Sequence, residues 1–140
     1  MPFKLLEDTA IADIAFEATG KTLEEVFESA ALAFSDISVD LNTVEGSLCK
    51  EIKLENEDPE KLLFDFLNQL VLLKDSQLLF NEFHVTIKKN QKYELMVEAC
   101  GEMINPEKQK LRDDIKAVTM HNFELKQTSN GWRAQVVVDI

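Results

Sequence analysis

The sequence has only four glycines and three prolines in 140 residues. This scarcity excludes low-complexity and disordered chains, and it leaves little glycine for a loop that cradles phosphates. The G-x-S-x-G, glycine-rich phosphate-binding and H-E-x-x-H motifs of common enzyme classes are absent from the sequence. The only two histidines, His84 and His121, lie on separate predicted strands, as structural residues usually do. We therefore expect a protein that is not itself an enzyme.

Basic residues are also scarce. Fifteen Lys and Arg stand against 26 Asp and Glu, which gives a net charge of -11. Affinity for nucleic acids depends largely on Lys and Arg that neutralise phosphates, so we expect no stable direct binding to nucleic acid. The negative charge instead favours attraction of cations or docking on a basic partner.

The sequence contains two cysteines, Cys49 and Cys100, with no C-x-x-C spacing. Two cysteines cannot build a disulfide framework or a zinc ribbon, and free cysteine commonly behaves as a small apolar residue. We therefore expect both thiols to be reduced and buried.

Long apolar runs are missing as well. The longest fully apolar run is Leu70–Leu73, whereas a membrane-spanning helix needs about 20 such residues. The first residues, Met1–Asp8, lack the apolar region of a signal peptide. The sequence predicts a soluble, cytoplasmic protein that does not associate with membranes.

Two segments have the periodicity and start signals of amphipathic helices. Thr22 and Glu25 form a capping box ahead of apolar residues at helical spacing over 23–34. Asp58 is a good N-cap for a second helix at Pro59–Leu73, whose proline suits the first helical position. The apolar stripe of the second helix is wide, which predicts a helix covered on more than one side.

Strand patterns fill much of the remaining chain. The predicted strands are Asp13–Ala18, Ser47–Leu54, Leu79–Lys88, Tyr93–Cys100, Ile115–Gln127 and Trp132–Ile140. The polar turns at 89–92 and 128–131 predict two hairpins, the second through an Asn-Gly pair. The whole pattern predicts an α+β fold, with two helices packed on one side of a mostly antiparallel sheet of about six strands. Residues 1–140 should form a single domain.

Asp139 stands apart from the other acidic residues because it ends the apolar run Val136–Val138 and only Ile140 follows it. If the last strand is ordered to its end, the side chain of Asp139 lies close to the chain's own carboxylate. Such a pair requires a cation or a proton. Asp13 is the natural third group if the first and last strands are neighbours, and three carboxylates favour a hard cation such as Ca²⁺ or Mg²⁺. The alternative is that the last two residues fray and bind nothing.

Several segments that are unspecific by themselves have a distinctive order and spacing when taken together. They are Ala12–Gly20, Thr22–Phe27 with Ala30-Ala31, Leu62–Asn68, Gly101-Glu102, Lys116–Thr119 with His121, and Val136–Ile140. On these segments, and so over essentially its whole length, the sequence resembles the archease family. The family usually carries His-Thr-Ala-Asp at the first motif. Here Ala10 and Ile11 precede Ala12-Asp13, so Asp13 is present but the His and Thr are not.

The resemblance implies an archease-like fold and a non-catalytic function. Archeases activate the RtcB-type tRNA-splicing ligase, which joins RNA ends carrying a 3′-phosphate or a 2′,3′-cyclic phosphate. This chain is then expected to promote guanylylation and multiple turnover of the ligase and to broaden its use of nucleotides. The alternative is a general chaperone or protein-interaction module with an incidental metal site. A small-molecule-binding domain is a weaker third interpretation, since the sequence has no cluster of polar pocket residues.

The resemblance also implies a site. The family binds a divalent metal, Ca²⁺ in crystals, through residues that match Asp13, Asp139 and the carboxylate of Ile140. Ca²⁺ is therefore the expected cation, with Mg²⁺ and Mn²⁺ as alternatives. Lys116, from the K-A-V-T motif, is either a counter-charge to the acids or a contact to the ligase or its nucleotide. Glu102 and His121 belong to the same predicted contact set.

Overall fold

Seven strands and two long helices make up the described chain, which comprises residues 2–6 and 13–140 of a computed structural model. In chain order the elements are β1 (Phe3–Leu6), β2 (Asp13–Gly20), α1 (Leu23–Ser38), the 3₁₀ turn η1 (Leu41–Thr43), β3 (Leu48–Asn56), α2 (Pro59–Asp75), β4 (Leu78–Lys89), β5 (Tyr93–Met103), β6 (Ala117–Thr128) and β7 (Gly131–Asp139). The segment with Ala10, Ile11 and Ala12, where the expected His and Thr are replaced, lies outside the described residues.

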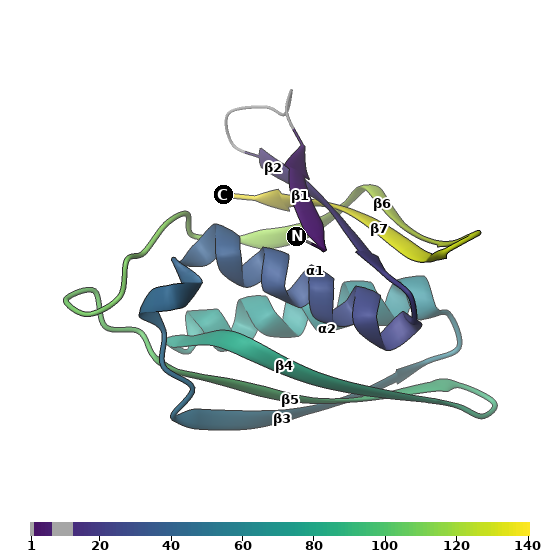
Figure 1. The fold of residues 1–140 in the computed structure, drawn as a ribbon, viewed down its shortest axis with the longest axis horizontal. Helices are drawn as coiled ribbons and strands as arrows, with labels where there is room; N and C mark the ends of the chain where they lie inside the picture. Colours follow the sequence, from purple (N-terminus) through teal and green to yellow (C-terminus); the bar gives the residue numbers. More distant parts are fainter. Residues whose placement is uncertain (1, 7–12) are drawn as a thin grey trace.

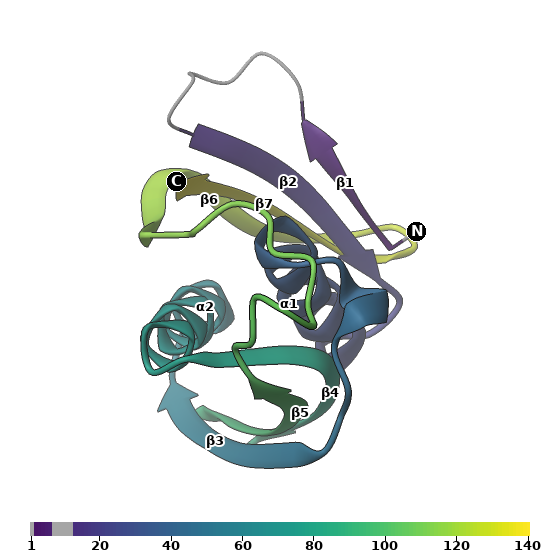
Figure 2. The ribbon, with the colours of Figure 1, turned by 90° about the vertical axis from the view of Figure 1, so that its left-hand side faces the viewer.

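The strands form two antiparallel sheets, and both helices lie between them (Figures 1 and 2). One sheet has the order β1-β2-β7-β6 and the other has the order β3-β5-β4. The α+β class and the packing of two helices on antiparallel sheets confirm the sequence prediction. The predicted single sheet of about six strands is wrong, because the strands divide into two sheets that cover the helices from opposite sides.

Both helices begin where their capping residues indicate. The Oγ1 of Thr22 accepts a hydrogen bond from the N–H of Glu25 (3.1 Å), and the Glu25 side chain accepts one from the N–H of Lys21 (2.7 Å). Asp58 likewise accepts a hydrogen bond from the N–H of Glu60 (2.9 Å) at the start of α2. Within the described ranges, no helix has the length and apolar character needed to cross a bilayer.

The core follows from the position of the helices. Helix α1 is buried on nearly all sides because each sheet covers one of its faces, and three of its alanines, Ala30, Ala31 and Ala33, are completely buried. Small side chains let the helix backbone approach both sheets closely. Phe27 of α1 and Phe66 of α2 stack with their ring centroids 6.0 Å apart. The two helices therefore form one apolar layer between the sheets.

Both predicted hairpins are confirmed, since β4 pairs with β5 and β6 pairs with β7. Strand β1 was not predicted, because four residues with a single buried side chain carry too little pattern to indicate a strand. It pairs with β2 at one edge of its sheet, while the other edge of β2 pairs with β7. The first long strand and the last strand of the chain are therefore neighbours.

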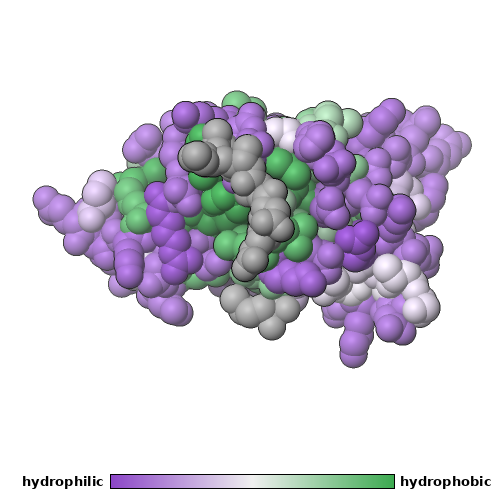
Figure 3. Space-filling view, turned by 90° about the horizontal axis from the view of Figure 1, so that it is seen from above, coloured by the Kyte–Doolittle hydropathy of each residue, from purple (hydrophilic) through white to green (hydrophobic). Residues whose placement is uncertain are grey.

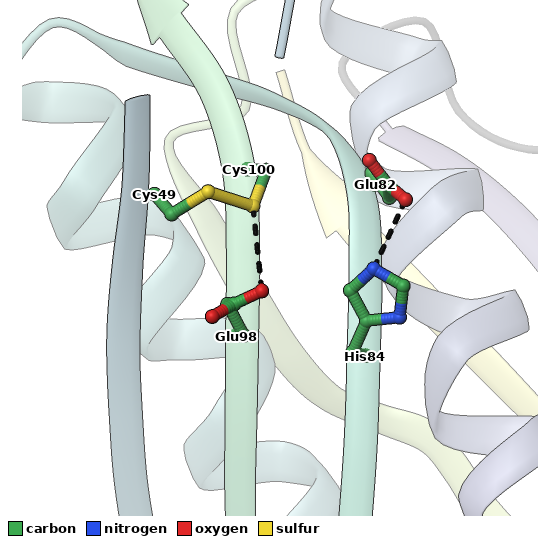
Figure 4. Close-up of a disulfide and its surroundings, with 5 residues drawn as sticks. All are labelled: Cys49, Glu82, His84, Glu98 and Cys100. Atoms are coloured by element: carbon green, nitrogen blue, oxygen red, sulfur yellow. Dashed lines mark hydrogen bonds and ion pairs between the residues drawn. A yellow bond between two sulfur atoms is a disulfide. The ribbon is translucent and has the colours of Figure 1, made fainter. Parts of the chain in front are cut away.

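The expectation of two reduced, buried cysteines is wrong. Cys49 of β3 and Cys100 of β5 are directly opposed across the sheet and form a disulfide, and Cys49 is exposed (Figure 4). Their opposition results from the register of two strands that are far apart in the sequence. A count of cysteines and their sequence spacing carries no information about that register.

Candidate metal centre

The pairing of β2 with β7 places Asp13 directly opposite Asp139. Phe16 and Val136, which pair three residues further along, are fully buried toward the helices. Successive side chains of a strand point to opposite faces, so Asp13 and Asp139 belong to the outer face of the β1-β2-β7-β6 sheet. The sequence left open whether the strand that begins at Asp13 and the last strand are neighbours, and the structure shows that they are.

Asp139 is held in place from both sides. It pairs with Asp13 on one side and with Ala117 of β6 on the other, and the backbone N–H of Lys116 donates a hydrogen bond to its carbonyl (2.8 Å). Ile140, the next residue, is half-buried and packs against the core. The structure therefore does not show fraying at Asp139, whose backbone belongs to one of the two inner strands of the sheet.

The two carboxyl groups interact directly. A hydrogen bond with the side chain of Asp13 raises the pKa of Asp139, and desolvation and the negative charge of Asp13 raise it further. The positive charge of Lys116 acts in the opposite direction. Two carboxyls held this close together mark a position where added positive charge is favourable.

The donor atoms at this position are all oxygens. Asp13 and Asp139 supply two carboxylates from neighbouring strands. Oxygen donors of this kind suit a hard cation such as Ca²⁺ or Mg²⁺ better than a soft metal. The residues present therefore fit the divalent cation that the sequence analysis expects.

Lys116 is the one predicted contact residue that the structure brings to the carboxylate pair. Its backbone N–H donates a hydrogen bond to the carbonyl of Asp139. Its positive charge partly offsets the rise in the pKa of that residue, which favours the counter-charge interpretation. His121 lies further along β6, in an irregular stretch between Thr119 and Glu124 where the register shifts. The exposed ring of His121 lies 3.2 Å from the side-chain amide of its neighbour Asn122. His121 is thus separate from the pair.

Glu102 belongs to the other sheet and has its own partners. It accepts hydrogen bonds from the Nζ of Lys108 (2.9 Å) and from the backbone N–H of Glu45 (3.0 Å). A hydrogen bond with Gln109, followed by those with Glu45 and Lys108, lowers the pKa of Glu102 to about 2. These contacts tie two loops to the end of β5, so the structure does not group Glu102 with Asp13 and Asp139.

The residues that follow the carboxylate pair along the outer face are apolar and buried. Ala15 and Val137 follow Asp13 and Asp139 on the same outer face, opposite one another in register. Figure 3, which looks onto this side of the molecule, shows an apolar area near the middle of the face with polar residues around it. Ala15 and Val137 themselves therefore add little exposed apolar surface beside the pair.

The sequence analysis missed one cluster of potential ligands within the described residues. The Sγ atoms of Cys49 and Cys100 and a carboxylate oxygen of Glu98 all lie within 4.8 Å of one another. Alternation along β3 and β5 places each of these side chains on a face, but only the register between the strands brings them together.

Comparisons with known proteins agree with this architecture. Residues 3–140 match the Archease protein family. The archease of Thermococcus kodakarensis is 41% identical over 132 residues, covering 92% of this chain and 93% of that protein. The archease of Methanosarcina acetivorans is 41% identical over 141 residues, covering 99% and 95%.

Two solved structures share the fold. The solution structure of Methanobacterium thermoautotrophicum protein 1598 superposes with a TM-score of 0.87 at 36% identity and covers 99% of both chains. The crystal structure of a Thermotoga maritima protein, named an archease and possible chaperone, gives a TM-score of 0.64 at 21% identity, covering 94% of this chain and 93% of that one. At that lower identity the likeness concerns the fold alone.

Proposed function

The chain belongs to the archease family, and on this premise we propose that it is a non-catalytic activator of an RtcB-type tRNA-splicing ligase. In this role it promotes guanylylation and multiple turnover of the ligase and broadens its use of nucleotides. The observation that carries the proposal is the pair of carboxyls, Asp13 and Asp139, held opposite each other on the outer face of a sheet. A rigid acidic group of this kind can be presented to the active site of another protein.

The proposal includes a divalent cation at this pair. Ca²⁺ is the proposed ion, with Mg²⁺ or Mn²⁺ as alternatives, and Asp13, Asp139 and the carboxylate of Ile140 are the proposed ligands. When bound, such a cation supplies a Lewis-acidic positive charge of the kind that phosphate oxygens prefer. Strands β2 and β7 orient the two aspartates, and Lys116 limits the excess negative charge around them.

Charge and surface shape support docking at the ligase's active site. A site that handles metal ions and phosphates is electropositive, and the net charge of -11 favours encounter with such a site. The apolar area on this side of the molecule (Figure 3) offers contact surface that does not depend on charge. A function that relied on net charge alone would not require two carboxyls in fixed register.

A guanylylation assay of the ligase, with and without this protein, tests the proposal. Asp139→Asn removes one negative charge and one proposed ligand while nearly preserving side-chain volume. Asp65→Asn is the matched control, because Asp65 is exposed on α2 and its replacement removes the same charge elsewhere. We expect Asp65→Asn to stimulate the ligase as the wild type does and Asp139→Asn to lose stimulation, with circular dichroism showing that both are folded.

The opposite result would favour the other candidate function. If folded Asp139→Asn stimulated the ligase fully, the active-site role would be refuted. A general chaperone or protein-interaction module would then be the better description, since the loss of one charge from a net of -11 is a small change for a charge-driven interaction.

A further inference from the structure

The outer face of the β3-β5-β4 sheet carries a second group of potential metal ligands. This sheet lies on the other side of the helices from Asp13 and Asp139 (Figure 1). Cys49 of β3 is opposite Cys100 of β5, and Glu98 lies two residues before Cys100 on the same face. The Sγ of Cys100 lies 3.9 Å from the Oε1 of Glu98 (Figure 4).

The backbone keeps these side chains together. The Cα atoms of Cys49 and Cys100 are 4.1 Å apart, the close spacing of directly opposed residues in antiparallel strands. The pairing of β3 with β5 extends over nine residues of each strand, from Leu48 to Asn56 on β3. The two sulfur atoms therefore remain neighbours when the bond between them is opened.

Solvent reaches the cluster from one side. Cys49 and Glu98 are exposed, whereas only 5% of the surface of Cys100 is accessible. Glu82 and His84, on the adjacent strand β4, border the cluster and pair with each other at 2.9 Å (Figure 4). An incoming ion or reductant can thus approach Cys49 and Glu98 directly, and Glu82 and His84 already have partners.

We propose that Cys49, Cys100 and Glu98 bind a thiophilic divalent cation, Zn²⁺, in the reduced chain, and that the disulfide and the metal-bound dithiolate are alternative states of this cysteine pair. Thiolate sulfur and carboxylate oxygen are both zinc ligands, and three protein ligands leave the fourth tetrahedral position open. With Zn–S near 2.3 Å and Zn–O near 2.1 Å, tetrahedral geometry sets ligand atoms about 3.6 to 3.8 Å apart. The 3.9 Å separation of Cys100 Sγ and Glu98 Oε1 is already close to this value.

The disulfide converts to the metal-bound dithiolate by reduction followed by binding of the cation. Two thiols of a reductant supply two electrons and two protons, leave as their own disulfide, and convert Cys49 and Cys100 to thiols. Binding of Zn²⁺ then releases both thiol protons to solvent. In the reverse direction, a small-molecule disulfide accepts two electrons from the two cysteine thiolates and leaves as two thiolates, while Cys49 and Cys100 bond again and the cation departs.

Cobalt(II) in place of zinc distinguishes this cluster from the carboxylate pair. A cysteine thiolate bound to Co²⁺ produces a charge-transfer band in the near ultraviolet, whereas a site of oxygens alone, as at Asp13 and Asp139, produces none. The protein is reduced with a phosphine, freed of excess reductant and titrated with Co²⁺, in parallel with the oxidised protein. We expect the band in the reduced chain, its loss on addition of Zn²⁺, and no band in the oxidised chain.

Three variants assign the ligands. Cys49→Ser should lose the thiolate band of the wild type, and Glu98→Gln should weaken Co²⁺ binding by at least about tenfold, since loss of even an outer-shell partner costs that much. Glu94 is exposed on the same face of β5, so Glu94→Gln is the matched control and should bind Co²⁺ as the wild type does.

Absence of the charge-transfer band in the folded, reduced wild type would overturn the proposal, as would an unchanged band in Cys49→Ser. Unchanged affinity in Glu98→Gln would overturn the three-ligand site. If Cys49→Ser fails to fold, the comparison of the charge-transfer band between the reduced and the oxidised wild type still tests whether the cysteines bind the metal.

Discussion

Calcium should raise the unfolding temperature of this protein, because Asp13 and Asp139 come together only in the folded chain. The two residues lie near opposite ends of the sequence, and the register of β2 with β7 alone opposes them. A ligand that binds only the folded state, at a concentration 100 times its Kd, stabilises that state by about 2.7 kcal/mol. An unfolding entropy of about 2.1 cal/mol/K per residue amounts to roughly 0.3 kcal/mol/K for this chain. The expected rise is therefore about 9 °C.

Thermal unfolding followed by circular dichroism measures this effect. The protein is first treated with a chelator and then titrated with CaCl₂, with NaCl adjusted to keep ionic strength constant, because salt screens surface charge. Asp13→Asn and Asp139→Asn should abolish the rise, whereas Asp65→Asn, on the exposed side of α2, should retain it. Residues appended after Ile140 should weaken it by displacing the terminal carboxylate. An equal rise in Asp13→Asn would refute the assignment, because calcium would then be binding elsewhere on an acidic surface.

Two further predictions concern the scaffold. Phe66 is fully buried, so Phe66→Ala should lower the free energy of unfolding, measured by urea denaturation, by about 3–5 kcal/mol. Leu72 on the same helix is 59% exposed, so Leu72→Ala should lower it by less than about 0.5 kcal/mol. A similar loss in both variants would contradict the position of α2 between the sheets. The pKa of Glu102 falls from 4.5 to about 2 in the folded chain, so its stabilising contribution is complete above pH 4.5 and is lost as pH falls through about 2. As pH falls over this range, the urea midpoint of Glu102→Gln should therefore decrease less steeply than that of the wild type. If the two midpoints fell in parallel, the lowered pKa of Glu102 would be refuted.

Local sequence signals account for most of the individual elements. Asp58 and Pro59 predicted the start of α2, and the polar turn at 128–131 predicted the hairpin of β6 and β7. Each signal acts within a few residues, through a cap or a turn, and so does not depend on the rest of the fold. Strand β1 escaped prediction because it is short and becomes a strand by pairing with β2.

The candidate metal centre was predictable only under a condition. The position of Asp139 at the end of an apolar run indicated a pair with the chain's own carboxylate, and the resemblance to archeases implied the same residues. Asp13 could join them only if β2 and β7 were neighbours. Glu102 shares the family pattern and yet lies in the other sheet, bonded to Lys108 and Glu45. Membership in a motif therefore did not determine proximity to the site.

The sequence by itself determined the helix starts, the hairpins, the α+β class, the acidic character and the family. Only the tertiary structure decided that the strands form two sheets with the helices between them, that Asp13 faces Asp139, and that Cys49 faces Cys100. The physical reason is the range of the interactions. Alternation of apolar residues tells which face of a strand is buried, but the neighbour and register of that strand depend on packing against segments far away in the chain.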